Sequence, residues 1–333
     1  MSAQRLPPLP TIKEIIRLYK LRARKQLSQN FLLDLNLTRK IVRAAGSLEG
    51  HHVCEVGPGP GGITRAILES GIADLRVIEK DVRFMPGLQL LNDVSGGKMR
   101  IFNGDILRFN MDDLFPTEAT QAWDDSPPKI HIIGNLPFNV STPLIINWLE
   151  AMSERTSAWK YGRVKLTLTF QKEVAERMVA PILNRQRCRL SVMCQYLCYV
   201  QHKFTIPGTS FVPPPDVDVG IVKFVPLKQP KIALPFRLVE KVVRHVFHFR
   251  QKMCKRGIAT LFPPDQPALT REMLSTADVS PDTRPFMLDI AEIDRLCHVY
   301  KDICDRHPGL IDYNYRSAEN ALDWRRAKLP LNI

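Results

Sequence analysis

The sequence predicts an α/β fold with a mainly parallel sheet, followed by a small helical domain. From residue 51 onward, short apolar runs alternate with longer runs of helical periodicity, which is the pattern of βαβ units. A glycine-rich loop follows the first apolar run, where such folds place their ligands. Beyond residue 229, apolar residues recur at helical spacing only.

Each predicted element can be placed in chain order. Strands are expected at residues 52–56, 75–79, 99–105, 129–135, 164–171, 199–207 and 220–226. Helices are expected between the first strands at residues 63–70 and 81–94, and in the tail at residues 237–249, 251–261 and 290–304. The proline-rich segment 226–236 interrupts both patterns and is interpreted as a linker.

Composition excludes several classes of protein. The chain has 333 residues, of which 44% are hydrophobic and 24% charged, as in ordinary globular proteins. No apolar run approaches the roughly 18 residues of a membrane span, so we expect no membrane partner. The seven cysteines form no CxxC pair, which argues against a disulfide framework and a zinc ribbon. We expect no metal site.

Positive charge is concentrated on both sides of an acidic segment. The formal net charge is +13 at pH 7. Residues 1–50 carry 10 basic and 3 acidic side chains, residues 51–152 carry 8 and 13, and residues 153–190 carry 9 and 3. This distribution favours a small-molecule site beside a surface for a polyanion. A generally basic protein from a basic compartment is the alternative.

The N-terminal residues 1–28 form a basic arm with three possible roles. Residues 1–25 contain seven basic side chains and only Glu14 as an acid. The segment resembles a mitochondrial targeting sequence, although it is poor in serine. An RNA-binding arm and a helix packed on the main domain fit equally well.

The loop after the first strand is GPGPGG, and its surroundings indicate the cofactor. Gly57, Gly59 and Gly62 fit the G-x-G-x-x-G pattern of dinucleotide sites, so a nicotinamide cofactor is one interpretation. The prolines between these glycines remove N–H donors that a pyrophosphate needs. Glu55 precedes the loop, and its carboxylate would repel phosphate but attract a sulfonium and an ammonium group. These features favour S-adenosylmethionine.

Two further acids follow the next two strands. Glu79 can accept hydrogen bonds from both hydroxyls of a ribose, because its two oxygens match a vicinal diol. Asp105 can accept from the adenine amino group, with Ile106 against the ring. Either acid alone could merely cap a helix. No lysine follows the loop as in nucleotide triphosphatases. Together these acids predict a Rossmann-like, class I S-adenosylmethionine-dependent methyltransferase domain.

The stretch NLPF follows the fourth strand and is suited to hold an adenine amino group. The side-chain oxygen of Asn135 and a backbone carbonyl at Leu136 or Pro137 can accept its two N–H bonds, with Pro137 fixing the turn. Phe138 can stack on a base that has been flipped out of its helix. The alternative is a capped turn with a buried phenylalanine.

Over nearly its whole length the chain resembles the ribosomal-RNA adenine dimethyltransferase family, and within it the mitochondrial branch. The resemblance lies in eight motifs: QNFLLD at 29–34, EVGPGPGGIT at 55–64, IEKD at 78–81, GD at 104–105, NLPF at 135–138, FQKEVAERMVA at 170–180, RLSV at 189–192 and FVPPPDVDV at 211–219. The family dimethylates two adjacent adenosines in the 3′-terminal hairpin loop of small-subunit rRNA.

The resemblance implies roles for individual residues. Gln29, Asn30 and Leu32 would close over the methionine end of the cofactor. Phe211 would cover the target base from the side opposite Phe138. The remaining cofactor residues would be Glu55, Gly57, Gly59, Glu79, Lys80, Asp105, Ile106 and Asn135, and the catalytic residues would be Asn135, Leu136, Pro137, Phe138 and Phe211.

These observations combine into one functional prediction. We expect a methyltransferase domain over residues 29–228 and a helical RNA-binding domain over residues 229–333. The expected partner is rRNA of the assembling mitochondrial small ribosomal subunit, in the matrix, with Arg185, Arg187 and Arg189 contacting phosphates. A non-catalytic factor that assists mitochondrial transcription is one alternative, and a large-subunit rRNA methylase is another.

Overall fold

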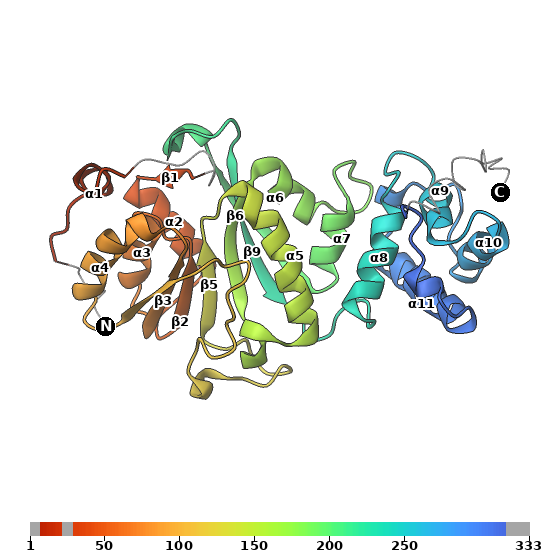
Figure 1. Ribbon diagram of the computed structural model, residues 1–333, viewed down its shortest axis with the longest axis horizontal. Coiled ribbons are helices and arrows are strands. Elements are labelled where there is room, and N and C mark those ends of the chain that lie inside the picture. The colour runs from red at the N-terminus through yellow and green to blue at the C-terminus, as the bar shows by residue number, and fades with distance from the viewer. Residues whose placement is uncertain (1–6, 22–28, 318–333) are drawn as a thin grey trace. The chain divides into compact units, whose positions relative to one another are not determined.

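The computed structural model describes residues 7–21 and 29–317 (Figure 1). Parts of the predicted basic arm, residues 1–6 and 22–28, lie outside the described residues. The chain divides into two compact units, residues 1–176 with 198–228, and residues 177–197 with 229–333. The sequence alone suggested a single boundary at residues 228–229, whereas packing also assigns residues 177–197 to the second unit.

The first unit is built on a seven-stranded sheet with the order β4-β3-β2-β5-β6-β9-β7. Its strands are β2 His52–Val56, β3 Asp74–Glu79, β4 Met99–Asn103, β5 Ile130–Gly134, β6 Lys165–Gln171, β7 Cys198–Ile206 and β9 Val219–Pro226. Strands β2 to β6 are parallel, and β9 runs antiparallel to both β6 and β7. The predicted α/β class is confirmed.

Helices pack against this sheet. They are α2 Leu35–Ala45, α3 Gly62–Leu68, α4 Met85–Asp93, α5 Phe138–Glu154 and α6 Lys172–Val179, whose last residues belong to the second unit. One apolar core joins buried residues of α2, α3 and α4 to alternate strand residues such as Val53, Val77 and Ile133. The alternation follows from the two-residue period of a strand.

A short N-terminal helix, α1 (Ile12–Leu18), belongs to the same core. Thr11 and Glu14 form a capping box at its start. Ile12 and Ile15 are buried, and the Ile15 side chain would lie 3.3 Å from a Cβ placed on Gly87 of α4. Of the three interpretations of the N-terminal arm, the described part therefore adopts the packed helix.

A two-stranded ribbon joins two distant parts of the first unit. Strand β1 (Phe31–Leu32) pairs antiparallel with β8 (Phe211–Val212). The ribbon brings the QNFLLD motif beside the FVPPPDVDV motif. It thereby places both motifs at one edge of the main sheet's ligand site, as described below.

The second unit is helical. Its helices are α7 Arg189–Gln195, α8 Phe236–Val246, α9 Cys254–Ile258, α10 Pro267–Thr276 and α11 Ile290–Arg306. Helices α8, α9 and α11 overlap the predicted helical segments, whereas α7 and α10 were not predicted. Among the described residues, no helix combines the length and apolar character that a bilayer span requires.

The expectation for Arg187 is wrong. Its side chain is only 1% exposed, and its guanidinium donates to the carbonyl oxygen of Ala180 at 3.1 Å and to Oε1 of Gln195 at 3.0 Å. Burial lowers its pKa. Arg187 therefore supports the fold of the second unit and cannot reach RNA, while Arg185 and Arg189 are exposed.

Candidate active site

The register of the parallel strands gathers polar side chains at one edge of the sheet. Glu55 of β2 pairs with Val77 of β3 and with Ile133 of β5. Glu79 ends β3, and Asn135 directly follows β5. Because the carboxyl ends of parallel strands meet at one edge, these three side chains face a common pocket.

The glycine loop adopts a backbone that permits close approach. Gly57 and Gly59 have φ values of +67° and +55°, which favour glycine. A Cβ on Gly57 would lie 3.2 Å from a methyl carbon of Leu136, so the pocket floor is already filled there. The Gly59 N–H donates to Oε2 of Glu79 at 3.0 Å, which connects the loop to the next strand end.

The environment of Glu55 shows which charge of cofactor the pocket suits. It lines the pocket and is 1% exposed, and its Oε2 has no partner among the described residues. Burial, with a smaller effect of the nearby Glu79 carboxyl, raises its pKa to about 8. A buried carboxyl oxygen without a partner suits an ammonium group. The residues therefore fit S-adenosylmethionine and oppose a pyrophosphate.

A second hollow of about 300 Å³ adjoins the first and contains the predicted nucleoside-binding residues. Glu79 and Ile106 line it together with Lys80 and Asp105. The Lys80 ammonium lies 2.8 Å from Oδ2 of Asp105, and this contact lowers the pKa of Asp105. Asp105 therefore stays ionised and keeps acceptor capacity for an amino group.

Asn135 is held by two partners. Its Nδ2 donates to the carbonyl of Asn30 over a long 3.4 Å, and its Oδ1 accepts from the hydroxyl of Thr169 at 3.0 Å. Thr169 is fully buried on β6. The two contacts fix the orientation of the Asn135 side-chain amide, and Oδ1 can still accept a second hydrogen bond. Sequence reasoning missed Thr169, because a threonine inside a strand carries no signal beyond its strand propensity.

The turn after Asn135 distinguishes two carbonyls that the sequence left equivalent. The Pro137 carbonyl accepts from the N–H groups of Val140 and Ser141, at 2.9 and 3.0 Å, and so starts helix α5. No described residue donates to the Leu136 carbonyl. Leu136 therefore supplies the backbone acceptor that remains available at this turn.

The segment before β1 is tied to the loop after β3. Nε2 of Gln29 donates to Oδ2 of Asp81 at 3.0 Å, and Arg83 contacts both residues. The Arg83 guanidinium lowers the pKa of Asp81 to about 2. The Phe31 ring meets Phe84 edge to face at 5.5 Å. The sequence motifs include Phe31 and Asp81, but no individual role was predicted for them, for Arg83 or for Phe84.

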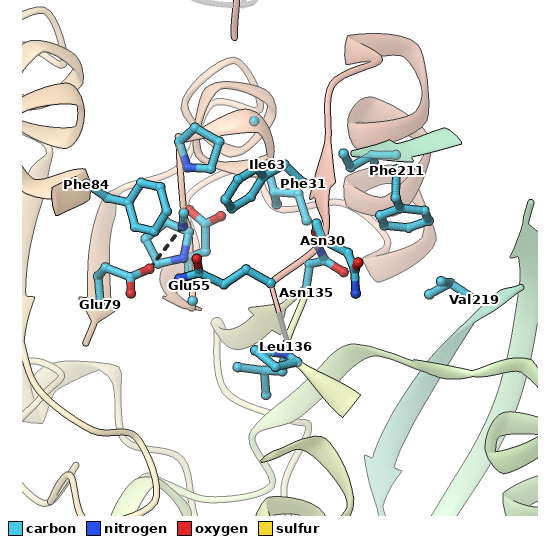
Figure 2. Close-up of a pocket in the computed structure, with 18 of the residues that line it drawn as sticks. Asn30, Phe31, Glu55, Ile63, Glu79, Phe84, Asn135, Leu136, Phe211 and Val219 are labelled. Carbon is cyan, nitrogen blue, oxygen red and sulfur yellow. Dashed lines mark hydrogen bonds between the residues drawn. The ribbon is translucent and has the colours of Figure 1, made fainter. Parts of the chain in front are cut away.

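Figure 2 shows the order of residues along the pocket. Glu79 and Phe84 lie at one end, Phe211 and Val219 at the other, and Asn30 and Asn135 between them. Every predicted site residue lines one of the two adjoining hollows. The first holds Gln29, Asn30, Leu32, Glu55, Gly57, Gly59, Glu79, Asn135, Leu136, Pro137, Phe138 and Phe211, and the second holds Lys80, Asp105 and Ile106.

A family model described as "Ribosomal RNA adenine dimethylase" matches residues 20–294, which include both hollows. The chain belongs to this family. The predicted cofactor is thereby confirmed, because this dimethylase family transfers methyl groups from S-adenosylmethionine to adenine in rRNA.

Similar sequences agree with the family match. The chain is 59% identical over 313 residues to "Dimethyladenosine transferase 1, mitochondrial" of Xenopus laevis, covering 94% of this chain and 91% of that protein. It is 58% identical over 317 residues to the protein of the same name from Homo sapiens, with 95% and 92% covered. The Drosophila melanogaster protein of that name is 49% identical over 324 residues, with 96% of each covered.

Solved structures support the fold. A dimethyladenosine transferase from Plasmodium falciparum superimposes with a TM-score of 0.62 at 21% identity, covering 81% of this chain and 96% of that one. The 23S rRNA methyltransferase ErmE gives a TM-score of 0.56 at 19% identity, with 82% and 100% covered. At these sequence identities the two superpositions show a shared fold.

Proposed function

We propose that this dimethylase converts two adjacent adenosines in the 3′-terminal hairpin of mitochondrial small-subunit rRNA to their N6,N6-dimethyl forms. The names of the relatives support the mitochondrial location, and the matrix is where that RNA is assembled into subunits. The observation that carries the proposal is Asn135, held by Thr169 and Asn30 in the same pocket as the buried Glu55.

The cofactor residues act by charge and shape. Bound S-adenosylmethionine supplies an electrophilic methyl group. Glu55 would hold its ammonium group through the unpartnered Oε2, and Glu79 would hold the ribose. Gln29, Asn30 and Leu32 would close the methionine end, with Gln29 anchored on Asp81. The glycine loop leaves room for close approach of the cofactor.

The target amine needs acceptors because its lone pair is delocalised into the adenine ring. Asn135 Oδ1 and the Leu136 carbonyl would accept its two N–H bonds, which favours a pyramidal nitrogen with its lone pair toward the methyl group. The cofactor held by Glu55 and Glu79 would supply the methyl group to this nitrogen, and the amine proton would leave to solvent. Phe138 and Phe211 would hold the flipped base from opposite sides.

The test is methylation of a defined RNA. The purified chain with radiolabelled S-adenosylmethionine should modify small-subunit rRNA, with primer extension stopping at the two adjacent adenosines. A hairpin with both adenosines replaced by guanosine is the control. Label on the control hairpin, or on large-subunit rRNA instead, would contradict the proposal.

A role in transcription alone would need no methyl transfer. In cells that carry only the Gly57→Ala variant, we expect loss of rRNA dimethylation and of small-subunit assembly. Normal assembly with altered transcript levels would favour the transcription alternative. For the matrix, a fusion of residues 1–40 to a reporter should be imported, and a cytosolic full-length protein would overturn that location.

A further inference from the structure

The second unit contains a polar pocket of about 390 Å³ that the methyl-transfer site does not use. One wall is a face of helix α8, where Lys241, Arg244 and His245 recur at helical spacing, followed by His248. The other wall is the segment 311–316 after α11. A volume of this size lies within the range of pockets that hold a small ligand.

The charge of this α8 pocket is positive. Lys241, Arg244 and Arg316 line it, and Asp312 is the acid among its lining residues. Glu240 lies 3.9 Å from Arg244 and only partly offsets that charge. Burial first, and then the charges of three of these cations and of His248, lower the pKa of His245 to about 3, so this imidazole is neutral at pH 7.

The cations of the α8 pocket have more N–H groups than their contacts within the protein use. The Lys241 ammonium donates to the carbonyls of Ile311 and Tyr313, at 2.5 and 3.0 Å, which uses two of its three N–H groups. The Arg316 guanidinium contacts the Tyr315 hydroxyl and Nδ1 of His248, which uses two of its five. The exposed Arg244 adds a third cation. A phosphate group accepts several such bonds at once.

Aromatic rings lie beside these cations. The ring centroids of His248 and Tyr315 lie 5.5 Å apart, and Phe249, which is 40% exposed, packs tilted against His248 at 4.2 Å. A bare phosphate site would need no such rings. Partly exposed rings beside arginine and lysine are typical of surfaces that bind single-stranded nucleotides.

We propose that the α8 pocket binds one unpaired nucleotide of the RNA substrate, with its phosphate on Arg244, Arg316 and Lys241 and its base against His248 and Tyr315. This inference rests on the proposed function for the identity of the RNA. It makes the second unit a substrate-holding module with its own site. The site would select RNA by backbone charge and an unstacked base.

The test is the salt dependence of RNA binding by the full chain. A fluorescein-labelled hairpin with two adjacent adenosines in its loop is titrated with protein over a range of KCl concentrations. Each lost phosphate contact makes the negative slope of log K against log salt shallower by about 0.7–0.9. Because the pocket holds one phosphate, the Arg244→Gln/Arg316→Gln variant should lose about 0.7 of slope and bind roughly tenfold more weakly. Arg271 is an exposed arginine of α10 outside the pocket, and Arg271→Gln should change the salt slope and the affinity less than the double variant does.

A ring variant separates base stacking from charge. Tyr315→Leu should weaken binding about fivefold or more and leave the salt slope unchanged. The thermal unfolding of every variant should match wild type, which confirms folding of the second unit. An unchanged slope and affinity in the double variant, with wild type binding the hairpin, would overturn the pocket and leave the proposed function intact. Failure of wild type to bind any RNA would instead contradict the proposed function.

Discussion

The buried carboxyl group of Glu55 should make cofactor binding depend on pH. Burial raises its pKa from 4.5 to about 8, so in the free protein it is mostly protonated at pH 7. An ammonium group beside its unpartnered oxygen favours the carboxylate. Binding therefore releases a proton, and the affinity for S-adenosylmethionine should fall about tenfold between pH 7 and pH 6.

The same rise in pKa affects the stability of the free protein. Because the folded pKa lies above the unfolded one, the stabilising contribution is fully present below pH 4.5 and is lost as the pH rises through about 8. The difference between these pKa values corresponds to about 5 kcal/mol at most. At pH values above 8, the cofactor-free Glu55→Gln variant should therefore have a higher thermal midpoint than wild type.

The assay is calorimetric titration of S-adenosylmethionine in two buffers with different ionisation enthalpies, which counts released protons. Glu55→Gln should bind more weakly and release fewer protons than wild type. The cofactor's own ionisation affects both proteins equally, and Glu49→Gln is a control at an exposed acid. Equal proton release by wild type and Glu55→Gln would refute the reasoning.

Three further predictions follow from the structure. Thr169→Val should lower kcat about tenfold with little change in KM, because the Thr169 hydroxyl orients Asn135. Thr169→Ser keeps a hydroxyl and should have the wild-type kcat. Equal kcat for Thr169→Val and wild type would contradict this role. Gly57→Ala should abolish cofactor binding in titration, whereas Gly50→Ala, which has the same φ of +67° outside the pocket, should bind normally. Arg187→Met should lower the free energy of unfolding by about 2–3 kcal/mol in urea titrations and leave the salt slope of RNA binding unchanged, whereas the exposed Arg185→Met should not destabilise.

The sequence predicts the part of the site that depends on strand order. Glu55, Glu79 and Asp105 each follow a recognisable apolar run, and parallel strands bring their ends together. Each of the seven strands of the main sheet carries a recognisable apolar run, so their positions are recovered within a few residues. The choice between a nicotinamide cofactor and S-adenosylmethionine follows from Glu55 and the loop prolines.

Other features depend on tertiary contacts that leave no local pattern. Strands β1 and β8 have two residues each, too few to show a period, yet their pairing brings Leu32 opposite Phe211. Arg187 stands between exposed arginines, and nothing in the spacing signals its burial. The choice of Leu136 over Pro137 as acceptor requires the start of helix α5 to be known.

The central claim is that Asn135 accepts a hydrogen bond from the target amine. Single-turnover methylation of small-subunit particles by Asn135→Ala, beside calorimetric titration of S-adenosylmethionine, tests it most directly. Loss of one oriented polar group should slow methyl transfer about 10²-fold or more, while cofactor affinity falls only modestly. Methyl transfer by Asn135→Ala at the wild-type rate would show that the NLPF turn is structural and that the proposed mechanism is wrong.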